Sequence, residues 1–95
     1  MNSAECIHHF ARLHGLSRLD VWRTCRDLGM LRQSMHAYWH GLRRPDPLAA
    51  SMLCVALDLD ARQCCELYES CGIPTPDPVW EAVNEAARGF IGGEE

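Results

Sequence analysis

Signals that start and stop helices recur along this chain, and they constrain its fold more than any other feature of the sequence. Asn, Ser or Asp stands where most helix N-termini are expected, and glycine follows most of the segments behind them. No segment shows the alternating pattern, or the Asn-Gly and Asp-Gly turns, that indicate strands and hairpins. The sequence therefore predicts an all-α fold.

The capping residues and glycines predict five helices followed by a helical tail. The predicted helices lie between Asn2 and Gly15, Ser17 and Gly29, Leu31 and Gly41, Asp46 and Leu57, and Asp60 and Gly72. The second helix could instead start at Asp20, because Asp is also an N-cap residue. Asp46 and Asp77 each precede a proline, a residue that favours the first position of a helix.

Apolar residues predict which helical faces are buried. In the second helix, apolar residues at every third position predict one buried stripe. These residues are Leu19, Trp22, Cys25 and Leu28. Residues 48–57 are apolar nearly all round, which predicts a central, buried helix.

Positive charge is concentrated in the first half of the chain, although the net charge is −4. Residues 1–44 hold seven arginines against three acidic residues, and residues 45–95 hold two arginines against ten acidic residues. Such a division favours a protein with one polyanion-binding end. The chain contains no lysine, so its basic surface depends on guanidinium groups, which match the geometry of phosphate and guanine.

The six cysteines are expected to be free thiols in a cytoplasmic protein. The N-terminus has no basic flank followed by an apolar run, and no apolar run approaches the roughly 20 residues that cross a bilayer. We therefore expect no membrane partner, and reduced cysteines that pack as small hydrophobic residues. An alternative is a thiol redox sensor that uses Cys64, Cys65 or Cys71.

No metal site, cofactor or catalytic site is expected. The sequence has no C-x-x-C pair, and His36 and His40, four residues apart, have no third ligand at a matching place. Gly-rich phosphate loops, H-E-x-x-H and G-x-S-x-G motifs are missing. We also expect a domain of this size to lack a cleft of about 300 Å³ or more. The sequence therefore predicts neither an enzyme nor a small-molecule substrate.

The stretch from Leu28 to Asp46 carries the functional signal. A helix ends in Leu-Gly, an apolar residue fills a turn, and a helix with polar side chains on one side follows. This stretch is similar to the helix-turn-helix of the lambda-repressor/Cro (XRE-like) family, and most of all to small phage and prophage regulators. The matching residues are Leu28-Gly29-Met30, Gln33-Ser34-Met35, Tyr38, Gly41, Arg43, Pro45 and Asp46. The likeness covers roughly residues 5–73 and places the helix-turn-helix at roughly Ser17 to Arg44.

The resemblance implies a five-helix, lambda-repressor-like bundle with an extra C-terminal helix. It also implies a sequence-specific, DNA-binding transcriptional regulator, a repressor encoded by a phage or prophage. The family's base-reading positions are occupied by Arg32, Gln33, His36 and Ala37. Its phosphate-binding positions are occupied by Ser34, His40, Arg43 and Arg44. Leu31 departs from the family pattern, because it stands where Ser or Thr would cap the recognition helix.

The tail is expected to make the protein a homodimer. Residues 1–73 form the predicted DNA-binding domain, 74–78 a proline-rich linker and 79–92 a C-terminal helix. The apolar stripe of that helix consists of Val79, Trp80, Val83, Ala87, Phe90 and Ile91. Because the stripe has no place in a five-helix core, we expect it to pack against a second copy. It could instead fold back on its own domain.

A protein-interaction module is the alternative function. The acidic residues 45–95 could bind a partner such as a toxin or another regulator. A steep loss of affinity with rising salt would distinguish DNA binding from this alternative.

Overall fold

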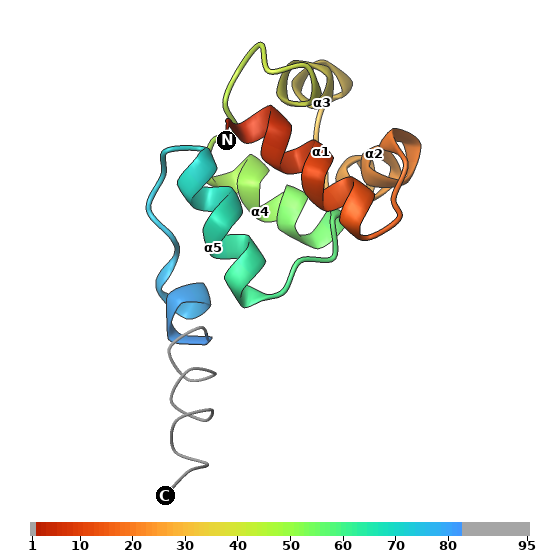
Figure 1. Ribbon diagram of the computed structural model, residues 1–95. Coiled ribbons are helices and arrows are strands. Elements are labelled where there is room, and N and C mark those ends of the chain that lie inside the picture. The colour runs from red at the N-terminus through yellow and green to blue at the C-terminus, as the bar shows by residue number, and fades with distance from the viewer. Residues whose placement is uncertain (1, 83–95) are drawn as a thin grey trace, which may run out of the picture.

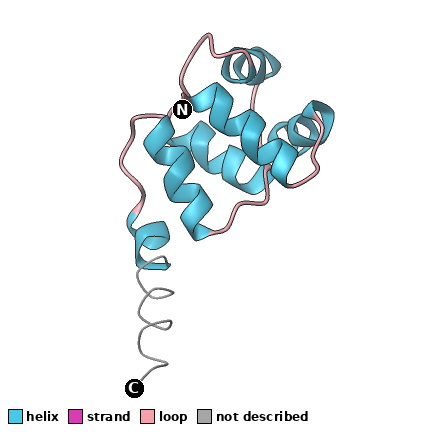
Figure 2. Ribbon diagram, viewed as in Figure 1, coloured by secondary structure: helices cyan, strands magenta, loops and turns pink. Residues whose placement is uncertain are grey.

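The protein is built from α-helices, as the sequence predicts. The computed structural model describes residues 2–82, and these residues contain no strand (Figure 2). The helices are α1 Ser3–Leu13, α2 Arg18–Asp27, α3 Arg32–Trp39, α4 Pro47–Ala56 and α5 Ala61–Ser70. Residues 77–82 are also helical. None of the helices in this described part is long and apolar enough to cross a membrane.

The five helices enclose one core. α4 packs against α2 and α5, α1 packs against α5 and α3, and α2 packs against α3. The largest fully buried side chains include Ile7, Phe10, Val21, Leu53, Leu57, Leu67 and Tyr68. Figure 1 shows α2 and α3 on one side of the bundle and the start of the tail on the other. The segment with the predicted helix-turn-helix therefore lies away from the described start of the tail.

Side-chain caps start four of the five helices. The capping residues are Asn2, Ser17, Asp46 and Asp60. Ser17 and Asp20 exchange hydrogen bonds in a capping box, so α2 starts after Ser17 and the alternative start at Asp20 is wrong. Leu31 precedes α3 without a side-chain hydrogen bond. The first turn of α3 therefore lacks the cap that supports the other helices.

Each of the five helices α1 to α5 is followed by a residue in the left-handed backbone conformation, and a backbone hydrogen bond spans that residue. At the end of α5, the backbone N–H of Ile73 donates to the Tyr68 carbonyl at 3.2 Å across Gly72, whose φ is 71°. This is a Schellman motif, in which a glycine in the left-handed conformation and the apolar residue after it close the helix. α4 differs in one respect, because Asp58 rather than glycine adopts the positive φ, 55°.

The predicted buried stripe of α2 is wrong for Leu19 and Leu28 and is confirmed for Cys25. Val21 and Cys25 are buried, whereas Leu19 is 53% exposed and Leu28 is also exposed. A helix turns by about 100° per residue, so residues three apart rotate by about 60° at each step and leave a common face. The two buried residues are four apart and stay on one face. Trp22 is half-buried at the edge of this face and packs against the core.

α4 is only half buried, although its apolar sequence predicts burial nearly all round. Ala50 and Leu53 lie in the core, whereas Leu48 and Val55 are 67% and 61% exposed. The helices packed against α4 are α2 and α5. They leave the side with Leu48 and Val55 in solvent, so α4 carries an exposed apolar strip.

The cysteines pack in the core, as expected of free thiols. Five of the six are buried, and Cys65 is half-buried. Burial raises the pKa of the Cys25 thiol to about 11. Burial also raises the pKa of the Cys64 and Cys71 thiols, which opposes the thiolate that a redox sensor needs.

The tail helix begins at Asp77, the residue predicted to cap it, so the cap position falls on Pro76. The Pro76 carbonyl accepts hydrogen bonds from the backbone N–H groups of Val79 and Trp80, both at 3.0 Å, so Asp77 lies in the first turn and does not precede it. Pro78 tolerates this shift, because a first-turn residue needs no N–H donor. Val79 packs against the core, and Trp80 is exposed. The remaining stripe residues, Val83, Ala87, Phe90 and Ile91, lie outside the described residues.

Candidate nucleic-acid interface

A tight turn joins α2 to α3. α2 ends at Asp27 and α3 begins at Arg32. Within the turn Gly29 has a φ of 102°, and the backbone N–H of Met30 donates to the Cys25 carbonyl at 2.9 Å. The Met30 side chain is buried. The turn thus has the apolar filling residue that the sequence predicts, and it holds the two helices against each other.

The outer face of α3 gathers the predicted base-contacting residues. Arg32, Gln33 and His36 are exposed, and Ala37 is half-buried. Residues four apart on a helix lie one above the other, so 32 and 36 form one row and 33 and 37 form the next. The structure therefore places all four residues on one surface of a single short helix.

Histidines extend this face toward the end of α3. The ring centroids of His36 and His40 are 4.5 Å apart. Desolvation lowers the pKa of the His40 imidazole below its ordinary value. His36, Arg18 and His8 lower this pKa further, because a proton on His40 would add positive charge beside them. An anion bound near His40 would favour the protonated ring, and a further cation would disfavour it.

Two of the predicted phosphate-binding residues contact each other. Arg43 Nη2 donates to Ser34 Oγ and to Tyr38 Oη, both at 3.1 Å. The guanidinium carbon of Arg43 lies 5.0 Å from the centroid of the Tyr38 ring, within the range of a cation–π contact. Arg43 is exposed nonetheless. These contacts position its guanidinium beside α3 before any ligand binds.

Arg44 lies apart from this group, although it follows Arg43 in sequence. Its Nη1 lies over Gly72, 3.0 Å from the position that a Cβ would occupy there. Gly72 follows the carbonyl end of α5, where the helix carries partial negative charge that suits a guanidinium. A phosphate-binding role for Arg44 therefore requires its side chain to leave this position.

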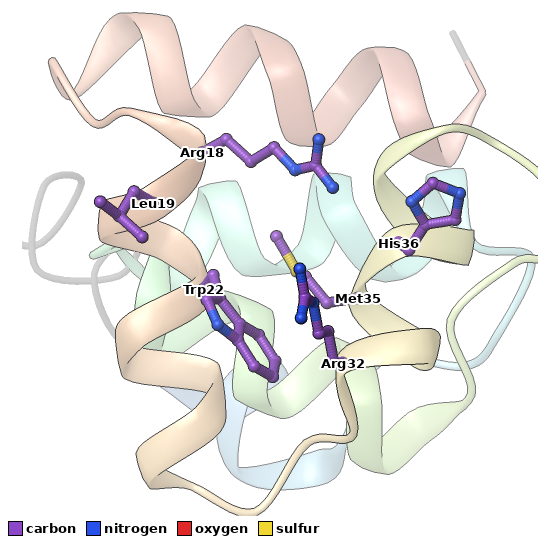
Figure 3. Close-up of a pocket in the computed structure, with 6 residues that line it drawn as sticks. All are labelled: Arg18, Leu19, Trp22, Arg32, Met35 and His36. Carbon is purple, nitrogen blue, oxygen red and sulfur yellow. The ribbon is translucent and has the colours of Figure 1, made fainter.

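A groove runs between α2 and α3, and the expectation that so small a domain has no cleft is wrong. Its volume is about 630 Å³. Its lining residues are Arg18, Leu19, Trp22, Arg32, Met35 and His36 (Figure 3). Figure 3 shows Arg18 extending from α2 toward α3 across the groove. The open space arises because α2 turns its Val21 and Cys25 face, and not its Leu19 side, toward the core.

Arg18 and Trp22 are site residues that the sequence does not reveal. Arg18 is the first residue of α2, and its position in the basic half of the chain is the only signal that the sequence carries for it. The spacing of apolar residues predicts a buried stripe that includes Trp22, yet this side chain lines the groove. Both positions depend on the way α2 is rotated against α3, which is a tertiary property.

The described residues offer no metal centre. Residues 2–82 contain no group of three or more His, Cys, Asp or Glu side chains that could hold a metal ion. His36 and His40 form a pair within this part of the chain, and their position on the outer face is compatible with hydrogen bonding to a nucleic acid.

No protein-family model matches the chain, and comparisons with curated proteins and with solved structures found no match either.

Proposed function

We propose that this protein is a sequence-specific DNA-binding transcriptional regulator, acting as a repressor and not as an enzyme, with α2 and α3 as its helix-turn-helix. The observation that carries the proposal is the joint exposure of Arg32, Gln33 and His36 on the outer face of α3. Arginine can bridge guanine O6 and N7, and glutamine can bridge adenine N6 and N7, each pair worth about 1–3 kcal/mol of discrimination. α3 would enter the major groove with its first turn toward the base edges.

Unpaired positive charge supports the same proposal. Among residues 2–82 the one ion pair joins Arg26 and Asp27, at 3.4 Å. Arg18, Arg32 and Arg43 therefore have no carboxylate partner among the described residues. DNA phosphates would supply the missing anions, and counterion release would make binding favourable and dependent on salt.

We propose that the regulator binds as a homodimer. One domain of this size reads about one half-site, and a pair of recognition helices about 34 Å apart would read two successive major grooves. Trp80 is exposed on the described part of the tail, although Val79 packs on the domain itself. A dimer through the tail would bury Trp80 against the second copy.

Fluorescence anisotropy tests the proposal with labelled duplexes from the region upstream of the protein's own gene and with shuffled duplexes of equal composition. We expect the specific duplex to bind at least about 10³-fold more tightly than the shuffled one at physiological salt. We also expect log K to fall linearly with log salt concentration. Equal affinity for both duplexes at every salt concentration would overturn sequence-specific binding.

A protein-interaction function is the second candidate, and the exposed strip of α4 favours it. Leu48 and Val55 place apolar surface in solvent on a helix that lies in the acidic half of the chain. A partner bound there would bury apolar surface, so its affinity would depend little on salt. Replacing both residues by serine would weaken such binding and leave DNA affinity unchanged.

A further inference from the structure

The groove between α2 and α3 combines an apolar lining with unpaired positive charge. Trp22 and Leu19 from α2 and Met35 from α3 supply the apolar surface. Arg18 and Arg32 supply two guanidinium groups, and no carboxylate lines the groove. Its volume of about 630 Å³ falls within the range of about 300–1,000 Å³ that is typical of small-molecule sites.

Each part of this lining selects a different part of a ligand. The half-buried indole of Trp22 offers a flat face on which an aromatic ring can stack. Arg18 and Arg32 can donate charge-assisted hydrogen bonds to a carboxylate or a sulfonate. A simple inorganic anion would leave the apolar lining in water, and a neutral aromatic compound would leave both guanidinium groups without an anion.

We propose that this groove binds a small planar aromatic anion, such as an aryl carboxylate, and that the bound compound prevents α3 from binding DNA. Arg32 and His36 line the groove and also belong to the outer face of α3. A ligand that engages Arg32 removes that side chain from the base edges and neutralises positive charge beside the phosphates. The compound would therefore release the protein from its operator. Only this second step rests on the proposed function.

The three tryptophans provide separate probes of the site. Trp22 lines the groove, Trp39 packs against His8 with ring centroids 4.4 Å apart, and Trp80 is exposed on the tail. Titrating the ¹⁵N-labelled full chain with 2-naphthoate at low salt should shift the indole N–H signal of Trp22 in a saturable manner. The signals of Trp39 and Trp80 should move little. The Trp22→Phe variant identifies the signal.

Two comparisons test the selectivity of the groove. We expect 2-naphthol, which is neutral at pH 7, and acetate, which has no ring, each to bind about tenfold more weakly than 2-naphthoate or worse. Arg18→Gln should weaken 2-naphthoate by about tenfold. Arg62→Gln, a matched change at an exposed residue of α5, should have no effect. A variant is scored only if its spectrum retains the dispersion of the folded protein.

Several outcomes would overturn the proposal. The site fails if Trp22 shows no saturable shift, if 2-naphthol binds as well as 2-naphthoate, or if Arg18→Gln and Arg62→Gln behave alike. The second step is tested by adding 2-naphthoate to the complex with the specific duplex. A ligand that shifts Trp22 without displacing DNA contradicts this step and leaves the site in place. Failure of any duplex to bind overturns the proposed function, whereas the Trp22 titration tests the groove independently.

Discussion

Giving α3 the side-chain cap that it lacks is expected to stabilise the protein relative to a variant that loses the same leucine without gaining a cap. Leu31 already has the extended backbone of an N-cap residue, with φ −75° and ψ 145°, and it makes no side-chain hydrogen bond. In Leu31→Ser the new hydroxyl can accept from the backbone N–H of Ser34, as Ser17 accepts from Asp20 at the start of α2. Such a cap is worth about 0.5–2 kcal/mol.

The substitution also removes a leucine side chain, and the cost of this removal has to be separated from the gain. Leu31 is 70% exposed, so less than a third of its surface is buried. Because full burial of a leucine contributes about 1.5–3 kcal/mol, removing the buried part of this side chain costs on the order of 0.5–1 kcal/mol. Leu31→Ala removes the same buried surface without adding a cap, and it is therefore the reference variant.

Thermal unfolding followed by circular dichroism measures the difference between the two variants. Leu31→Ser is expected to unfold about 4–8 °C above Leu31→Ala for each kcal/mol that the cap contributes. Asp46→Ala removes the observed cap of α4 and should lower the stability by about 1 kcal/mol. If both Leu31 variants unfold at the same temperature while Asp46→Ala is destabilised, the reasoning about the first turn of α3 is refuted.

Four further predictions concern DNA binding. Gln33→Ala should relax base preference at one position per half-site and leave the melting temperature of the protein unchanged. Anisotropy with duplexes that differ by single base pairs measures this preference, and an unaltered preference would exclude Gln33 from base contact. Arg43→Ala and Arg44→Ala should each weaken specific and shuffled duplexes alike and flatten the salt slope by about one unit, whereas an effect confined to the specific duplex would indicate base contact instead. Deletion of residues 83–95 should give a folded monomer with weak operator affinity, and a dimer in sedimentation would contradict the proposed role of the tail. Because the pKa of His40 is lowered in the folded protein, the stability that His40 contributes should fall as the pH drops below about 6.5. DNA phosphates favour the protonated ring, so DNA affinity should rise over the same pH interval. His40→Gln should remove part of this rise.

Helix boundaries were predictable because the signals that set them act within a few residues. The Ser17 cap bonds to Asp20, three residues away, and Ile73 bonds back to Tyr68 across Gly72. The uncapped start of α3 at Leu31 was equally visible, since it depends on one side chain. These features are local geometry of the backbone, which neighbouring residues determine without help from the rest of the chain.

The faces of those helices were decided only by tertiary packing. Leu48 and Val55 belong to a helix that is apolar nearly all round, and nothing in its sequence says which side meets α2 and α5. The groove beside Trp22 exists because α2 is rotated so that Val21 and Cys25 face the core.

The candidate site shows the same division between local and tertiary information. The row of Arg32 and His36 follows from helical periodicity alone, which makes it readable from the sequence. The position of Arg18 across the groove from α3, and the separation of Arg43 from Arg44, depend on the relative placement of whole helices. That placement is set by the packing of many side chains that are distant in sequence, and so it could be known only from the assembled fold.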